Sequence, residues 1–292
     1  MPVRMTSGTA RPVPRSLAAV LAELELLAPE TVDRAQMEQV LAAADHPDAG
    51  SPAHVNDVID RLRRAGWLLP MRTRGVWEFA PASRSGAFRS GDPFTELRAY
   101  LQRHPDDPAV MAMESAAFRR GLAQHPPSRE VIAVDGLVRR DGALGSYRHV
   151  SLALGPRAST PMDGVPTHTV EALLVAMACK PAGYRDWPNV GLWLADAAAQ
   201  IATDPAVDGA NGDPSEVAVG VTGVVELLQQ ATVAAWARAA YLLRAGDQPG
   251  AARALITAAP GRPSGPVYLG PRSQAKTYDS STGVYDALLN QS

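Results

Sequence analysis

Residues 51–79, SPAHVNDVIDRLRRAGWLLPMRTRGVWEF, contain the signals that decide the fold. The first half is bounded as a helix, because Ser51 suits the N-cap, Pro52 the first helical position and Gly66 the residue after the last turn. Between these signals, apolar side chains recur at helical spacing and form one narrow stripe: Val55, Val58, Ile59 and Leu62. The segment therefore predicts an amphipathic helix with one buried face.

The second half of this stretch, GWLLPMRTRGVWEF (66–79), has the pattern of a β-hairpin. Two apolar arms, each containing a tryptophan, flank the turn Arg72-Thr73-Arg74-Gly75. A glycine at the end of such a turn permits a positive φ angle. We therefore expect a hairpin whose tip is basic.

Two more helices are predicted on the amino-terminal side of this stretch. One has a shared face of leucines and a valine, and the other has a shorter apolar stripe: Leu17, Val20, Leu21, Leu24 and Leu27 in the first, and Met37, Val40, Leu41 and Ala44 in the second. Three helices followed by a hairpin are typical of a winged helix-turn-helix over residues 15–80. In such domains the third helix enters the major groove of DNA and the hairpin, or wing, reaches the backbone or minor groove.

The charge distribution within this region favours the same interpretation. The whole chain has a formal net charge of −2, so only local charge can indicate a nucleic-acid surface. Residues 51–90 carry seven arginines against three acidic residues, whereas residues 1–50 carry four arginines against seven acidic residues. The basic character is thus confined to the third helix, the wing and the segment after it, where phosphate contacts would be needed.

The side chains expected to contact DNA lie on the third helix and at the hairpin tip: His54, Asn56, Arg61, Arg63, Arg64, Arg72, Thr73 and Arg74. Asp57 and Asp60 share the predicted outer face of the helix and would repel phosphates. They could pair with Arg61 and Arg64 one turn later, or accept hydrogen bonds from cytosine amino groups. The alternative for all these charges is an ordinary solvated face, since a winged domain can also serve as a protein-interaction module.

The rest of the chain predicts an α+β organisation in which a larger helix-rich domain with a small β-sheet follows the winged domain. Residues 1–14 are expected to be a disordered lead, 81–92 a linker and 93–292 the second domain. Within it we expect two strands and a loop, at 129–138, 147–155 and 204–215. Two short strands are expected in the tail after residue 260. Apolar periodicity predicts helices at 93–103, 109–121, from 167 onward, 188–201, 216–230, 232–245 and 249–258.

Several function classes lack support in the sequence. The single cysteine, Cys179, suits a reducing, cytoplasmic compartment and excludes a cysteine-rich zinc module. The six histidines are too widely spaced to indicate a metal site, and no phosphate-loop, dinucleotide-binding or serine-nucleophile motif is present. We therefore expect no catalytic residue, no metal and no cofactor. No apolar run is long enough to suggest a membrane span.

Two groups of arginines in the second domain are not explained by a DNA-binding amino terminus. Arg139, Arg140 and Arg148 surround a predicted turn, and Arg238 and Arg244 lie on an otherwise apolar helix. They could be solvated, or they could form a surface for an acidic partner or a second contact with DNA.

Several segments together resemble the AbiEi family, the antitoxins of bacterial abortive-infection toxin–antitoxin systems (type IV). Besides the winged domain, these are MESAAFRRGL (113–122) followed by the strand REVIAV, the helical run THTVEALLVAMACKPAGYRDWPNVGLWLADAA (167–198), and ATVAAWARAAYLLRAGD (231–247). Phe118, Arg119 and Arg120 depart from the residues usual in the first of these motifs, and Ala240 stands where the family usually has glycine.

This resemblance implies two roles. The amino-terminal domain would bind inverted repeats in its own promoter and repress transcription. The carboxy-terminal domain would neutralise a partner toxin, a nucleotidyltransferase-like protein. The resemblance implies no catalytic residue. An alternative from the residues alone is a stand-alone winged-helix regulator whose larger domain senses a small molecule in an apolar pocket.

Overall fold

The computed structural model describes residue 13 and residues 15–47, 51–84, 90–136, 142–203 and 221–289. Several predicted features lie wholly or largely outside these ranges: the lead 1–14, the centre of the linker, Arg89, Arg139, Arg140 and the loop 204–215. The described helices and small sheets confirm the predicted α+β class. The chain divides into two compact units, with the main division between Asp106 and Asp107; the described residues 142–145 also belong to the first, N-terminal unit.

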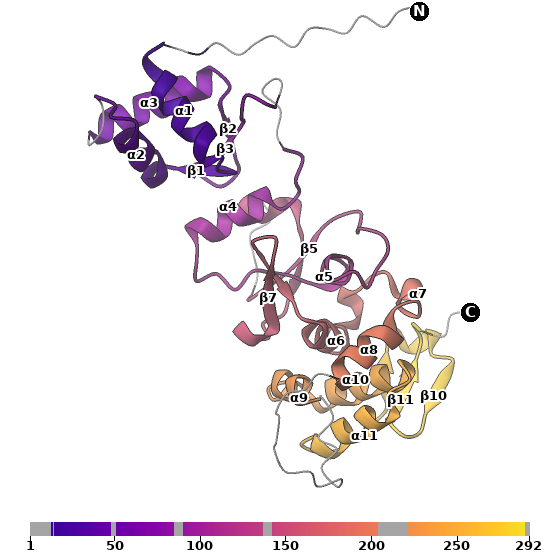
Figure 1. Ribbon diagram of the computed structural model, residues 1–292. Helices are drawn as coiled ribbons and strands as arrows, with labels where there is room; N and C mark the ends of the chain where they lie inside the picture. Colours follow the sequence, from indigo (N-terminus) through magenta and orange to yellow (C-terminus); the bar gives the residue numbers. More distant parts are fainter. Residues whose placement is uncertain are drawn as a thin grey trace, which may run out of the picture. The chain divides into compact units, whose positions relative to one another are not determined.

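The N-terminal unit contains helices around a three-stranded antiparallel sheet of order β1-β3-β2 (Figure 1). Its elements, which include a short η1 turn of 3₁₀-helix, are η1 (Arg15–Leu17), α1 (Ala18–Leu27), β1 (Thr31–Asp33), α2 (Arg34–Ala43), α3 (Pro52–Arg64), β2 (Leu68–Pro70), β3 (Val76–Phe79) and α4 (Thr95–Arg103). The predicted stripes of α1, α2 and α3 are buried in one apolar cluster, except for Leu27 and Ala44. Strand β1 was not predicted, because three residues are too few to show a period-two pattern.

Helix α2 begins where Asp33 ends the short strand β1. The Asp33 carboxylate accepts a hydrogen bond of 2.8 Å from the Gln36 amide, and the Gln36 side chain accepts one of 2.9 Å from the Asp33 amide. This reciprocal capping box satisfies two amides that a helix start would otherwise leave unpaired. The cap thus fixes the direction in which the chain leaves the sheet.

The predicted hairpin is present, with Leu68 opposite Phe79 and Leu69 opposite Glu78. Successive side chains of a strand point to opposite faces, so these two pairs lie on opposite sides of the sheet. Leu68 and Phe79 belong to the core shared with α1–α3. Leu69 and Glu78 are also buried, with 7% and 2% of their surface exposed. The hairpin is therefore covered on both faces.

Helix α4 belongs to the N-terminal unit, whereas the sequence pattern placed the division at residues 92–93. Arg98 on α4 donates hydrogen bonds of 2.5 and 2.6 Å to the Glu30 carboxylate and also pairs with Asp92. Burial alone would lower the pKa of Arg98, but these hydrogen bonds and charges raise it above its ordinary value. The contacts with Glu30 join residues more than 60 positions apart, so local sequence patterns could not reveal them.

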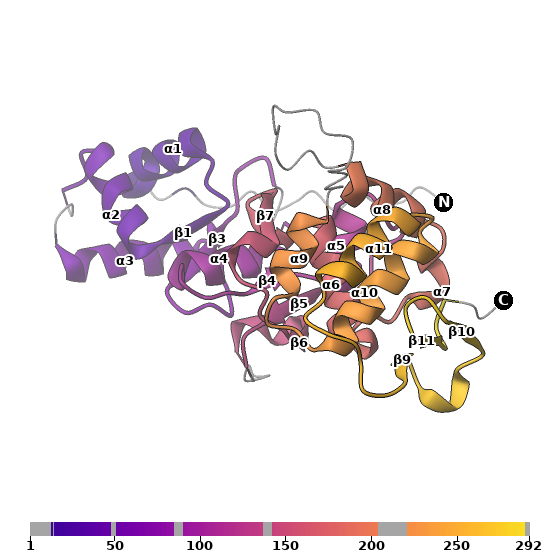
Figure 2. The same ribbon diagram turned by 90° about the horizontal axis from the view of Figure 1, so that it is seen from below.

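The C-terminal unit combines a five-stranded sheet, a three-stranded sheet and a group of helices (Figures 1 and 2). Strand order in the larger sheet is β6-β5-β4-β8-β7, and in the smaller β10-β11-β9. The strands are β4 (Val110–Met111), β5 (Val131–Val134), β6 (Arg148–Ser151), β7 (Ser159–Met162), β8 (Val165–His168), β9 (Val267–Leu269), β10 (Thr277–Asp279) and β11 (Val284–Asp286). The helices are α5 (Met113–Arg119), α6 (Val170–Cys179), α7 (Trp187–Val190), α8 (Leu194–Thr203), α9 (Thr222–Leu228), α10 (Val233–Ala245) and α11 (Pro249–Ala258).

The core of this unit is formed around α6 and α10, which contact each other and are almost wholly apolar where they meet. Thr169 and Thr232 cap the two helices, each accepting from the amide three residues later. Alanine is abundant on both helices, and its small side chain allows close approach of their backbones.

Two predicted helices of this unit differ from the structure, and one pair of strands was not predicted. The predicted helix 109–121 is shortened because Val110 and Met111 pair with β5 and β8 as strand β4. The predicted helix 188–201 is divided into α7 and α8 by a turn beginning at Gly191. Strands β7 and β8 occupy the segment 159–168, where no strand was predicted.

Candidate nucleic-acid interface

Helix α3 presents a polar surface opposite its buried stripe. His54, Asn56, Arg63 and Arg64 are exposed, and Arg61 is half-buried. The helix begins at Pro52 as predicted, although the Ser51 side chain makes no capping hydrogen bond. Gly66 follows the last turn with a φ of 78°, the left-handed conformation expected of a glycine at this position.

The two acidic residues of α3 are paired with arginines of the same helix. Asp57 lies 3.7 Å from the Arg61 guanidinium, and Asp60 lies 2.9 Å from that of Arg63. The predicted partner of Asp60 was Arg64, and this detail was wrong, since Arg64 instead donates a hydrogen bond of 3.3 Å to the Asp60 carbonyl. Residues three apart on a helix are neighbours as much as residues four apart. Much of the positive charge of α3 is therefore balanced locally.

The hairpin tip carries exposed positive charge that is not balanced in this way. Arg72 and Arg74 are exposed on either side of Thr73, and Gly75 completes the turn with a φ of 77°. Among the described residues, no carboxylate lies within ion-pair distance of Arg64, Arg72 or Arg74. These three guanidinium groups keep their charge available to an external anion.

Thr73 lies at the hairpin tip but is only 4% exposed, which corrects its assignment to the DNA-contacting set. Its hydroxyl lies 3.5 Å from the Glu96 carboxylate of α4, and the Arg72 amide donates to the same carboxylate at 2.8 Å. The buried threonine and the carboxylate fasten the turn to α4. Thr73 therefore orients the two neighbouring arginines rather than facing solvent.

Helix α4 adds polar groups to the hairpin tip that the sequence pattern did not assign to it. Arg72, Arg74, Tyr100, Arg103 and His104 line a cavity of about 770 Å³ together with Thr73, Gly142 and Ala143. Arg103 and His104 are exposed, and the Tyr100 and His104 rings lie 4.6 Å apart. Arg103 was missed because residues 93–103 were assigned to the other domain. The helical spacing of Leu97, Tyr100 and Leu101 in TELRAYLQR predicts a helix but does not show which part of the chain it packs against.

The candidate side chains thus form two groups within the N-terminal unit. One lies on the outer face of α3, and the other lies at the hairpin tip and the end of α4. No described hydrogen bond or ion pair joins the two groups. Each could contact a separate part of a long polyanion.

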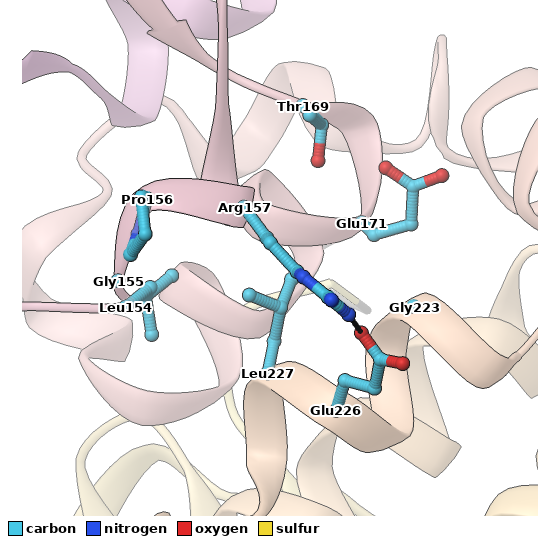
Figure 3. Close-up of a pocket in the computed structure, with 9 residues that line it drawn as sticks. All are labelled: Leu154, Gly155, Pro156, Arg157, Thr169, Glu171, Gly223, Glu226 and Leu227. Atoms are coloured by element: carbon cyan, nitrogen blue, oxygen red, sulfur yellow. Dashed lines mark hydrogen bonds and ion pairs between the residues drawn. The ribbon is translucent and has the colours of Figure 1, made fainter.

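A cavity of about 470 Å³ in the C-terminal unit has a different character (Figure 3). Leu154 and Leu227 give it an apolar side, and Thr169 and Glu171 give it a polar one. An ion pair of 2.8 Å between Arg157 and Glu226 lies among its lining residues. With two carboxylates and one guanidinium, this cavity does not favour an anionic ligand.

The described residues contain no group of three or more histidine, cysteine, aspartate or glutamate side chains placed to hold a metal ion. Within the same residues, no helix has both the length and the apolar character needed to cross a bilayer.

Comparison with known proteins shows that the fold of this chain is similar to that of a solved structure. No protein-family model and no curated protein matches this chain. The crystal structure of the RV2827C protein from Mycobacterium tuberculosis matches it with a TM-score of 0.70 and 24% sequence identity, over 97% of this chain and 95% of that one. At this identity the likeness concerns the fold alone.

Proposed function

We propose that this protein binds duplex DNA through a winged helix-turn-helix formed by α1–α3 and the β2–β3 hairpin, and that it represses its own promoter. The observation that carries the proposal is the pair of exposed arginines at the hairpin tip, Arg72 and Arg74, which have no carboxylate partner among the described residues. Guanidinium groups bind phosphate oxygens in a bidentate manner, and such contacts position a protein on DNA.

The fastening of the hairpin tip supports this role. Glu96 holds the backbone of Arg72 and the side chain of Thr73, so the tip loses little conformational freedom when it binds. Arg103 on α4 extends the same positive surface. On α3, the exposed His54 and Asn56 lie near the helix start, the part of a recognition helix that contacts base edges.

We further propose that the protein is an antitoxin of the AbiEi type, acting against a nucleotidyltransferase-like toxin. The order of the resembling segments supports this, since they correspond to α5, to α6–α8 and to α10, and these helices share one core. An autorepressor that reads an inverted repeat would do so as two protomers, each on one half-site.

The DNA proposal is tested by titrating a fluorescein-labelled duplex of the protein's own promoter at several salt concentrations. Changing Arg72 and Arg74 to alanine should weaken binding across sequences and reduce the slope of log K against log salt by about 2, close to 0.9 for each phosphate that the protein no longer neutralises. A matched double variant, Arg253→Ala with Arg262→Ala, removes two exposed arginines of the C-terminal unit.

The matched variant should keep the wild-type slope. An unchanged slope in the Arg72→Ala, Arg74→Ala variant would contradict contact through the hairpin. Equal reductions of affinity in both double variants would show that only net charge matters.

The antitoxin role has its own test. Co-expression with the product of an adjacent nucleotidyltransferase-like gene should relieve growth arrest. The hairpin variant should still relieve it, because we assign neutralisation to the C-terminal unit. Growth arrest that persists beside abundant wild-type protein would contradict the antitoxin role and leave the DNA-binding role standing.

A further inference from the structure

A second cavity of the C-terminal unit is lined by positive charge. It measures about 470 Å³ and lies between β6 and the segment that follows α6. Four of its lining residues are cations, Arg148, Lys180, Arg185 and Arg238, and His149 is a fifth ionisable group. None of its lining residues is a carboxylate, in contrast to the cavity containing Arg157 and Glu226.

Two of these cations are held in place by the protein. Arg148 pairs with the buried Glu114 and donates a hydrogen bond of 2.5 Å to the Gly183 carbonyl. Arg238 donates from Nε to the Tyr268 carbonyl at 2.7 Å and from Nη1 to the Ala178 carbonyl at 3.1 Å. Arg238 has no other partner among the described residues, so its remaining N–H groups have no acceptor there.

The other two cations have no carboxylate partner in the described part of the chain. Lys180 and Arg185 are exposed, and neither side chain takes part in an ion pair there. Among the described residues, Glu114 is therefore the one carboxylate that forms an ion pair with any of these four cations, and its partner is Arg148. Burial lowers the pKa of Arg238, which indicates that its charged form is incompletely compensated.

The walls of the cavity are firmly positioned. The Trp187 indole donates a hydrogen bond of 2.9 Å to the Pro181 carbonyl. A Cβ atom at Gly183 would lie 3.0 Å from Cε of Met113 and 3.3 Å from Val150, so the segment packs closely against the core. Donors that are fixed before binding lose little entropy when a ligand arrives.

We propose that this cavity binds the phosphate group of a small phosphorylated molecule. A phosphate monoester offers a double negative charge and three acceptor oxygens, which match the unused N–H groups of Arg238 and the free charges of Lys180 and Arg185. The volume lies in the range of small-molecule sites and leaves space for an organic group beside the phosphate. This inference does not rest on the DNA-binding role.

The test is isothermal titration of the full-length protein with inorganic phosphate and, separately, with adenosine 5′-monophosphate. We expect saturable binding with one site per chain. The double variant Lys180→Gln, Arg185→Gln should weaken it at least tenfold. The matched variant Arg253→Gln, Lys276→Gln removes the same number of charges elsewhere in the unit and should bind as the wild type does.

Three results would overturn the inference. One is the absence of saturable binding to the wild-type protein by either probe. Another is an equal reduction of affinity in both double variants, which would indicate general attraction of anions. The third is weaker duplex binding by Lys180→Gln, Arg185→Gln without any phosphate binding, which would assign the cavity to a nucleic-acid surface. Intact circular dichroism spectra of both variants ensure that a change in affinity does not reflect unfolding.

Discussion

The hairpin tip of the N-terminal unit and the end of helix α5 in the C-terminal unit both contain arginines, yet they use them in opposite ways. Arg72 and Arg74 are exposed and have no carboxylate partner among the described residues. Arg120 instead donates to the carbonyls of His168 and Thr167, and to the Thr160 hydroxyl at 2.8 Å. The first arrangement leaves charge available for binding, whereas the second uses it to join strands and helices.

This comparison shows that the number of arginines in a region is a weak guide to its function. A guanidinium that donates to backbone carbonyls stabilises the fold and has few N–H groups left. One with its N–H groups in solvent contributes little to stability but can bind an anion. The hydrogen-bond and ion-pair partners of an arginine, rather than the number of arginines in a region, therefore distinguish the two roles. Four experiments test this distinction.

The largest effect is expected at the buried pair of Arg148 and Glu114, whose side chains are 14% and 8% exposed. Arg148→Met should lower the free energy of unfolding by about 3–5 kcal/mol, because Glu114 would remain buried without a charged partner and would keep only the hydrogen bond from the Arg185 amide. Arg72→Met should change it by less than about 0.5 kcal/mol. Urea denaturation measures both, and similar destabilisation of the two variants would break the comparison.

The next effect concerns His168, which is 1% exposed. Burial, with the nearby charge of Arg120, lowers its pKa from 6.5 to about 4. Between these values the unfolded chain binds a proton that the folded chain does not, so stability is lost as pH falls from about 6.5 to 4. The loss attributable to His168 should reach about 3 kcal/mol.

Comparison with a variant isolates this contribution from other titrating groups. His168→Gln should remove the corresponding part of the pH dependence of the unfolding free energy. A pH profile of His168→Gln that parallels the wild type would show that His168 is not the group responsible.

A smaller effect on stability is expected at the hydrogen bonds between Glu96 and the hairpin tip. Glu96→Ala removes the acceptor of the Arg72 amide and the Thr73 hydroxyl and should cost about 1 kcal/mol of stability. Hydrogen exchange at the Arg72 amide should become faster, and duplex affinity should fall although no cation is removed. Glu38→Ala, which removes the exposed partner of Arg34, is the control and should change neither quantity at the tip.

The smallest effect is expected on α3. Changing Asp57 and Asp60 to asparagine removes the ion pairs with Arg61 and Arg63 and should alter stability by less than about 1 kcal/mol, because both carboxylates are exposed. Duplex affinity should rise a few-fold and its salt slope should steepen. A fall in affinity confined to duplexes with a particular cytosine would instead indicate that these carboxylates accept from the base.

Much of the N-terminal fold follows from local pattern. The stripe of α3, its first residue Pro52 and its terminating Gly66 were predicted correctly, as was the hairpin around Gly75. Glycine φ angles and helix periodicity depend on neighbours within a few residues, which is why they can be read from the chain. Strand β4 was predicted as part of a helix because its two residues gain their conformation from β5 and β8.

The candidate site was less predictable than the fold. The exposed arginines at the hairpin tip were identified from the sequence, but the burial of Thr73 and the contribution of Arg103 were not. Both follow from the packing of α4, in which Glu96 holds residues 23 and 24 positions earlier. No local signal indicates such a partner.

The sequence by itself determined where helices and the hairpin form, because backbone conformation follows from apolar spacing, caps and turn residues close along the chain. Only the tertiary structure decided which charged groups are neutralised. Arg120 is held by residues 40 to 48 positions away, and Arg238 by one 60 positions away. Such partners meet through the packing of the core, so the availability of a charge is a property of the folded molecule.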